Sequence, residues 1–216
     1  MHRSRNRSSR PALALAVFTL VALSAACVST QQATRAGLPS AGDATAAAPE
    51  PAPPALPSGT ALMTPRPGLY ASGQPGTGDW AALSAAGVRT VVNLRTPSEM
   101  EGRDERAEVE AAGLRYVEIP VAGAAGIDAD KAAQLSALLA GVDGAVLVHC
   151  ASGNRVGGLL AVAMAQTGMS EDEALAFGRS AGMKSTEARA REVITARRVE
   201  LCATGAAPPA MQCAAP

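Results

Sequence analysis

One short segment restricts the fold of this chain more than any other: an apolar run that ends in a cysteine and a small polar loop. Residues 146–149 are Val, Leu, Val and His, a pattern typical of a buried parallel strand. Residues 156–164 are apolar or glycine and favour a buried helix. Residues 150–155 therefore join the end of a strand to the start of a helix. Parallel α/β sheets bind their ligands at such strand ends.

The loop between strand and helix is suited to hold an anion. Unpaired backbone N–H groups and the positive end of the helix dipole favour negative charge there and lower the pKa of a thiol. Gly153 permits a turn with positive φ, and Arg155 offers a planar set of donors for two phosphate-like oxygens. We interpret Cys150 as a nucleophile in a phosphate-binding loop made of Cys150, Ala151, Ser152, Gly153, Asn154 and Arg155. A buried structural thiol and a surface ion pair are the alternatives for Cys150 and Arg155.

The order of His149, Cys150, Gly153 and Arg155 resembles the His-Cys-x-x-Gly-x-x-Arg signature of cysteine-dependent tyrosine and dual-specificity phosphatases. Arg155 comes five positions after Cys150, whereas that signature has six. The shorter spacing also resembles the loop of rhodanese-type sulfurtransferases, in which the cysteine carries a persulfide. His149 either tunes the thiol or is an ordinary strand residue, and the sequence leaves both interpretations open.

Upstream, the chain is similar to the phosphatase-like domain of the beta-lactamase hydrolase-like family, over roughly residues 68 to 165. The similarity is carried by Tyr70 to Pro75, Trp80 to Leu83, Gly87 to Arg95, Glu99 and Tyr116 to Val121. It implies a tyrosine-phosphatase-like fold with a shortened loop. It also implies a place at the rim of the site for Arg95 and Glu99, although a charged helix start explains them equally well.

Two departures from the phosphatase pattern bear on catalysis. Dual-specificity phosphatases carry an acidic aspartate after the strand that precedes the catalytic one, but residues 120–124 contain no acid. Asp128 and Asp130 are the nearest candidates, and Asp128 also has the position of a helix N-cap. Val156 stands where phosphatases usually have a Ser or Thr that assists turnover. The missing aspartate, which acts as general acid in those phosphatases, and the missing Ser or Thr both predict slow hydrolysis. General acid catalysis alone contributes a factor of about 10²–10⁴ in rate.

The N-terminal residues are typical of a secretory signal. Arginines without any acid precede an uncharged run from Ala12 to Ala26, which is too short to span a bilayer. The stretch from Leu23 to Cys27 resembles a bacterial lipobox, with ordinary cleavage nearby as the alternative. We therefore expect an exported protein of the periplasm or cell envelope, anchored to a membrane through a lipid on Cys27.

The remaining cysteines divide into a nucleophile and a pair. Because an exported compartment is oxidising, we expect a disulfide between Cys202 and Cys213, with two free thiols in a tail as the alternative. Cys150 then stays unpaired, as a nucleophile must.

Composition divides the chain into a signal peptide (1–26), a flexible Ala/Pro-rich linker (27–66), one folded domain (67–201) and a flexible C-terminal tail (202–216), and the resemblance implies that the domain is phosphatase-like. Within the domain we predict strands at 69–72, 88–94, 115–120 and 145–149, and helices near 78–86, 98–112, 129–140, 155–167, 171–181 and 185–201. The alternation of strands and helices predicts an α/β fold: a mostly parallel sheet flanked by helices on both faces.

Charge and histidine content exclude several functions. Four of the 19 basic side chains lie before residue 27 and none of the 19 acidic ones does, so the rest of the chain has four more negative than positive side chains. We therefore expect no nucleic-acid partner. His149 is the one histidine beyond His2, so we expect no metal site, and we expect no cofactor. Lys184 is interpreted as a surface residue, with contact to an anion as the alternative.

The leading functional hypothesis is a cysteine-dependent phosphatase-like hydrolase that acts on a small phosphorylated substrate or a phosphoprotein. In this hypothesis Cys150 attacks the phosphoryl group while the loop and Arg155 stabilise its oxygens. Two alternatives remain: a rhodanese-like sulfurtransferase with a persulfide on Cys150, and a non-catalytic anion-binding module.

Overall fold

The computed structural model describes residues 53–208, 211 and 213, and the predicted signal peptide, Cys27 and most of the predicted linker lie outside these residues. The strands are β1 (Leu62–Arg66), β2 (Leu69–Ser72), β3 (Val88–Asn93), β4 (Arg115–Glu118) and β5 (Ala145–His149). The helices are α1 (Asp79–Ala85), α2 (Glu105–Ala111), α3 (Ala129–Gly141), α4 (Asn154–Gln166), α5 (Glu171–Ser180) and α6 (Glu187–Thr204), with a 3₁₀ helix η1 (Pro97–Met100).

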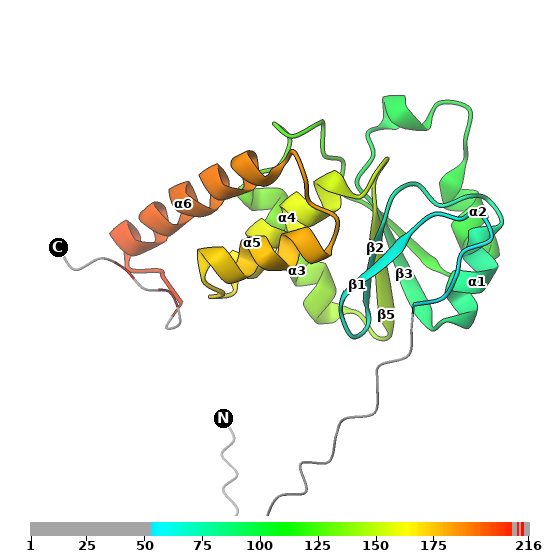
Figure 1. The fold of residues 1–216 in the computed structure, drawn as a ribbon, viewed down its shortest axis with the longest axis horizontal. Coiled ribbons are helices and arrows are strands. Elements are labelled where there is room, and N and C mark those ends of the chain that lie inside the picture. The colour runs from blue at the N-terminus through cyan, green and yellow to red at the C-terminus, as the bar shows by residue number, and fades with distance from the viewer. Residues whose placement is uncertain (1–52, 209–210, 212, 214–216) are drawn as a thin grey trace, which may run out of the picture. The chain divides into compact units, whose positions relative to one another are not determined.

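The five strands form one sheet in the order β1-β2-β5-β3-β4. β2, β5, β3 and β4 run parallel to their neighbours, and β1 pairs antiparallel with β2 at the edge (Figure 1). The predicted α/β fold with a mostly parallel sheet is confirmed. Because β5 is the middle strand, the residue that follows His149 lies at the centre of the carboxyl edge of the sheet.

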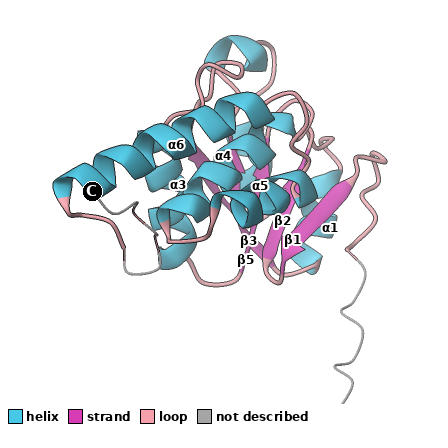
Figure 2. Cartoon of the chain, turned by 60° about the vertical axis from the view of Figure 1, so that its left-hand side comes forward, coloured by secondary structure: helices cyan, strands magenta, loops and turns pink. Residues whose placement is uncertain are grey.

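Helices cover both faces of the sheet, and the alternation of side chains along β5 feeds the two cores. Val146 and Val148 belong to the core under α3, α4, α5 and α6, whereas Leu147 belongs to the core under α1 and α2. Figures 1 and 2 show the four helices of the first group together on one side of the sheet. Trp80 and Leu83 of α1 anchor the smaller core.

Helix α4, which follows the loop, is buried along most of its length. Gly157 permits its close approach to α5, because a Cβ at this position would overlap backbone atoms of Gly178 and Met183. The start of α4 is thereby packed closely against α5, and this packing supports the loop that precedes α4.

The folded part begins earlier than the predicted boundary at residue 67. Strand β1 lies inside the range that we predicted as flexible linker, and its half-exposed residues and Pro65 hide the pattern of a strand. Upstream of it, Leu56 is buried, and the Ser58 N–H donates to Asp79 Oδ1 at 2.9 Å. The linker prediction is therefore wrong for these residues.

One predicted helix is interrupted. The range 98–112 contains η1 and α2 instead, separated by Gly102 at φ 79° and by Asp104, whose side chain caps α2 through the Ala107 N–H. The charge pattern of this range is helical, but the left-handed glycine ends the first helical turn. The other predicted elements agree with the structure to within a few residues at their ends.

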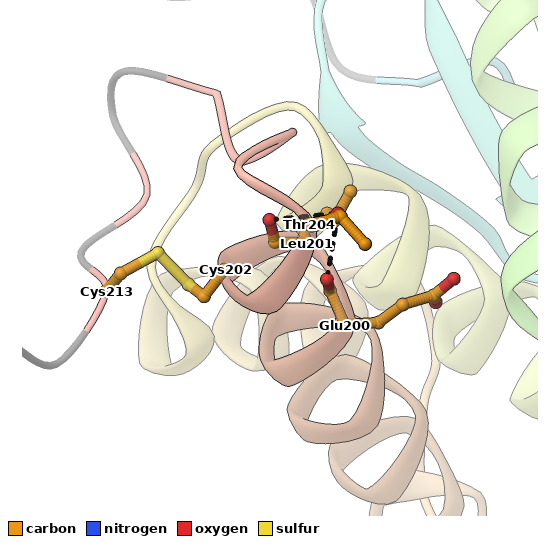
Figure 3. Close-up of a disulfide and its surroundings, with 5 residues drawn as sticks. All are labelled: Glu200, Leu201, Cys202, Thr204 and Cys213. Atoms are coloured by element: carbon orange, nitrogen blue, oxygen red, sulfur yellow. Dashed lines mark hydrogen bonds between the residues drawn. A yellow bond between two sulfur atoms is a disulfide. The ribbon is translucent and has the colours of Figure 1, made fainter. Parts of the chain in front are cut away.

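Helix α6 extends to Thr204, so Cys202 lies in a helix and not in the predicted tail. Its sulfur is joined to that of Cys213 in a disulfide whose Cα atoms are 5.7 Å apart (Figure 3). Gly205 ends the helix in the left-handed conformation at φ 69°. In the part of the chain that the structure describes, no helix is both long and apolar enough to cross a membrane.

Candidate active site

The predicted nucleophile lies where the sequence placed it, directly after β5. Cys150 is 1% exposed, and within the described residues it is the free cysteine. Its backbone N–H donates to the Ser72 carbonyl oxygen of the neighbouring strand at 3.4 Å. The Gly153 N–H donates to the Cys150 sulfur at 3.2 Å. A donor aimed at the sulfur stabilises negative charge on it, which a nucleophilic thiolate needs.

Gly153 shapes the loop. It is the N-cap of α4 at φ 84° and ψ −20°, a left-handed conformation that glycine adopts without strain. A Cβ there would lie 3.2 Å from the Met63 methyl group of β1. The N–H groups of Asn154 and Arg155 lie in the first turn of α4, where the helix itself supplies no acceptor, so they are available to an anion.

Arg155 is held by three hydrogen bonds that leave one edge of its guanidinium for a ligand. Nη1 donates to Glu99 Oε2 at 2.8 Å and to the Val121 carbonyl oxygen at 2.7 Å, and Nη2 donates to Glu99 Oε1 at 2.5 Å. Of the five N–H hydrogens, the one on Nε and the second on Nη2 remain, and these two point the same way. Such a pair of donors matches two oxygens of a phosphoryl group.

The pKa of Arg155 is raised, first by its hydrogen bond to Glu99, with burial opposing and the neighbouring Cys150 side chain also raising it. The guanidinium therefore lies near the thiol. Arginine and nucleophile therefore face the same small volume at the end of the sheet.

Glu99 is the carboxylate of this site. It caps the 3₁₀ helix η1 together with Thr96, whose backbone N–H donates to Glu99 Oε2 at 2.9 Å. The hydrogen bonds from Arg155 lower the pKa of Glu99 to about 2, with burial opposing and Thr96 assisting. Glu99 is therefore ionised at neutral pH and has no proton to give.

A shallow cavity of about 280 Å³ opens beside the loop. Small or polar residues line it: Glu99, Gly123, Ala124, Ser152, Asn154, Arg155, Ser185 and Thr186. Gly123 and Ala124 belong to the segment after β4 in which phosphatases carry their acid. The lining contains no aromatic side chain and no aspartate among the described residues.

Asn154 ties the loop to the segment before α6. Its Oδ1 accepts hydrogen bonds from the backbone N–H groups of Lys184 at 2.8 Å and Thr186 at 3.3 Å, and its Nδ2 donates to Ser185 Oγ at 2.8 Å. Lys184 itself is exposed and does not line the cavity. The sequence alone does not reveal the contact between Asn154 and residues 184–186, because these two segments are distant along the chain.

His149 points away from the loop into the smaller core. Its ring is fully buried, and its Nε2 lies 2.9 Å from Oε1 of the equally buried Glu105, although the two atoms are not aligned as a hydrogen bond. Burial raises the pKa of Glu105, but His149, Gln74 and Arg103 lower it by more, so the carboxylate is ionised. Sequence analysis missed Glu105, because a glutamate at the start of a short helix is typical of solvent-exposed charge.

The predicted acid Asp128 lies apart from this cavity. It is the N-cap of α3, where its Oδ1 accepts the Lys131 N–H at 2.8 Å, and its carboxylate is paired with the Lys131 ammonium group. Burial raises the pKa of Asp128, but the bonds from Lys131 outweigh it and the net shift is downward. Asp130 is exposed in the first turn of α3, and Val156 is fully buried. Among residues 53–208, no cluster of three or more His, Cys, Asp or Glu side chains has the geometry of a metal site.

Comparison with known proteins found related sequences and folds. The family model described as "Beta-lactamase hydrolase-like protein, phosphatase-like domain" matches residues 62–169. A beta-lactamase hydrolase-like protein of Xylella fastidiosa is 39% identical over 119 residues, which are 53% of this chain and 27% of that protein. One of Agrobacterium fabrum is 35% identical over 91 residues, 40% of this chain and 21% of that protein. The chain thus spans about a quarter of the length of the curated relatives it matches.

Solved structures share the fold. TpbA of P. aeruginosa superposes with a TM-score of 0.51 at 24% identity, covering 68% of this chain and 91% of that one. The kinase associated phosphatase, crystallised with its catalytic cysteine changed to serine, superposes with a TM-score of 0.53 at 15% identity, covering 67% of this chain and 96% of that one. At these identities the likeness shows a tyrosine-phosphatase-like fold and nothing finer.

Proposed function

The chain belongs to the family of beta-lactamase hydrolase-like protein phosphatase-like domains, and from this premise we propose that it is a phosphoric monoester hydrolase with Cys150 as nucleophile. One observation carries the proposal. Arg155 is fixed by Glu99 and Val121 with its remaining donor edge free, beside a sulfur that accepts a backbone N–H. This is the arrangement that a thiolate needs to attack a phosphoryl group whose oxygens are already held.

In the first step the thiolate of Cys150 attacks phosphorus, and the bond between phosphorus and the leaving oxygen breaks. The leaving oxygen takes its proton from water, since the cavity offers no protonated acid. In the second step water attacks the phosphocysteine, the bond between phosphorus and sulfur breaks, and inorganic phosphate and the thiolate are released; the proton of the attacking water neutralises the hydroxide left by the first step. Throughout, the N–H groups of the loop and the free edge of Arg155 stabilise the phosphoryl oxygens.

The proposed substrates are small phosphorylated molecules or phosphoproteins with a good leaving group. Glu99, the carboxylate that lines the cavity, is ionised and occupied by Arg155. Esters of acidic phenols depart without protonation, so they lose little from the missing acid. The open cavity without an aromatic wall sets no strong preference for the group that carries the phosphate.

Hydrolysis of a series of aryl phosphates by the purified full chain tests the proposal. We expect phosphate release that rises steeply as the leaving phenol becomes more acidic, and a loss on the order of 10³ or more in Cys150→Ser. Cys213→Ser is the matched control, because it removes a cysteine far along the chain from the loop, and it retains activity. Equal rates in wild type and Cys150→Ser would overturn the proposal.

A non-catalytic anion-binding module is the second candidate, favoured by one observation: the cavity is lined by no aspartate among the described residues, and its glutamate is ionised. Tungstate binding that is lost in Arg155→Ala, without phosphate release from any aryl phosphate, would support it. Sulfur transfer rests on the length of the loop alone. A persulfide mass on Cys150 after thiosulfate treatment would support it.

We further propose that the domain acts at the cell envelope, tethered through a lipid on Cys27. The support is the sequence of residues 1–27. Mass spectrometry of the mature N-terminus in a bacterial host provides the test. We expect an acylated Cys27 in the membrane fraction, and release of a Cys27→Ser variant from it. An unmodified, cytoplasmic N-terminus would contradict the proposal.

A further inference from the structure

A chain of polar side chains, fully buried at Glu105 and His149 and partly buried from Gln74 to Glu99, connects the two ends of the loop. It begins at the Glu105–His149 contact, in which both side chains are 0% exposed. Burial of an ionised carboxylate is costly unless it is paired and hydrogen-bonded. Glu105 lies beside His149, the residue that precedes the nucleophile. Packing alone does not explain why a charged side chain is buried at this position.

The chain continues from Glu105 through one amide. Gln74 donates from Nε2 to Glu105 Oε2, and its Oε1 accepts a hydrogen bond from Arg95 Nη1 at 2.5 Å. A carboxylate requires a donor and a guanidinium requires an acceptor. An amide supplies both from one end of a side chain without adding charge. Gln74 is thus chemically matched to both of its neighbours.

The chain ends at the anion-binding arginine. Arg95 Nη2 donates to the backbone carbonyl oxygen of Glu99, and Arg95 Nε lies 3.8 Å from Glu99 Oε1. The carboxylate of Glu99 holds both terminal nitrogens of Arg155. The partly buried amide of Gln74 is thus linked to the Arg155 guanidinium through Arg95 and Glu99.

We propose that Gln74 and Glu105 are positioning residues that keep the free edge of Arg155 directed at the bound anion. This inference rests on the proposed function, because it concerns the same site. Neither residue lines the cavity. They act on affinity for the anion by fixing the 95–99 segment that carries Glu99.

Tungstate, an oxyanion that requires no turnover, is the probe. For the full chain we expect its Kd to weaken about tenfold in Gln74→Met, which removes the links to both Glu105 and Arg95, and in Glu105→Gln, which removes the buried charge; both changes nearly conserve volume. For aryl phosphates, KM is expected to rise by a similar factor with a smaller change in kcat. Glu110→Gln is the matched control, because Glu110 lies on the same helix and pairs with the exposed Arg106, outside the Glu105–Gln74–Arg95–Glu99 links. It retains the wild-type Kd.

Arg95→Met breaks the chain at a partly exposed link, so it serves if a buried variant fails to fold, and the same weakening is expected. A lower melting temperature with an unchanged Kd in Gln74→Met or Arg95→Met overturns the inference and leaves the hydrolase proposal standing. Tungstate binding by a wild type that releases no phosphate overturns the hydrolase proposal, and the ratio of Kd values still decides the inference. No tungstate binding by the wild type overturns both.

Discussion

Glu99 grips Arg155 at the terminal edge of the guanidinium, with Nη–Oε distances of 2.5 and 2.8 Å. The pair joins η1 to the first turn of α4, which are far apart along the chain. The Arg155 side chain is therefore oriented before a ligand binds. Its side-chain entropy is lost when the protein folds and not when the ligand binds.

This pair makes stability depend on acidity in a defined direction. The pKa of Glu99 falls from 4.5 to about 2 on folding, so its contribution is complete above about pH 4.5 and is lost as the pH falls toward 2. We expect Glu99→Gln to be destabilised at pH 6 and the difference from wild type to shrink between pH 4.5 and 2. Urea unfolding of both proteins across this range measures it. A difference that is constant with pH would contradict the assigned pairing.

Gly153→Ala tests the left-handed turn of the loop. The strain of an alanine at φ 84° costs about 1–2 kcal/mol, and the added methyl group presses on Met63. We expect lower stability together with weaker tungstate binding. Gly113→Ala is the control, since it has φ 75° with no atom within 4 Å of the new Cβ, and only its stability should fall.

Asp128 distinguishes a helix cap from a general acid. As the N-cap of α3 it should lose about 1 kcal/mol of stability in Asp128→Ala and almost none in Asp128→Asn, because asparagine caps equally well. Neither change should alter kcat for aryl phosphates. A fall of about a hundredfold in Asp128→Asn, with the melting temperature unchanged, would identify Asp128 as the acid.

Gly157→Ala tests how tightly α4 is held. The new methyl group would overlap the backbone near Gly178 and Met183, and we expect a loss of about 2–3 kcal/mol in the free energy of unfolding. In Gly141→Ala, at the end of α3, the new Cβ meets no atom within 4 Å, so the change should be small. Calorimetric or urea unfolding compares the two. Equal effects would mean that α4 and α5 separate more easily than their packing indicates.

The strongest local patterns in the sequence correctly predicted the central strand β5 and the loop that follows it. The continuous apolar residues of β5, followed by Cys150 and a glycine, specify a buried strand and a turn without help from the rest of the chain. β1 could not be predicted in the same way, because an edge strand buries little, and its pairing with β2 and not its own pattern makes it a strand.

Contacts between distant segments account for what sequence analysis missed. The resemblance placed Glu99 at the rim, but the sequence does not show that its carboxylate occupies Arg155, which lies 56 positions further along. Glu105 looks like a surface charge until α2 packs its first turn against the end of β5. Local periodicity reports which side of an element is apolar, and it is silent about which polar groups meet.

The contacts of Asn154 with residues 184–186 have a consequence for the limits of the working unit. The match to the family model ends at residue 169, yet the first turn of α4 is fastened to a segment beyond that limit. A fragment that ended at residue 169 would keep Cys150 and Arg155 but would lose the contacts of Asn154 with residues 184–186. For excision or transplantation into another protein, the smallest autonomous module is larger than the part that homology marks.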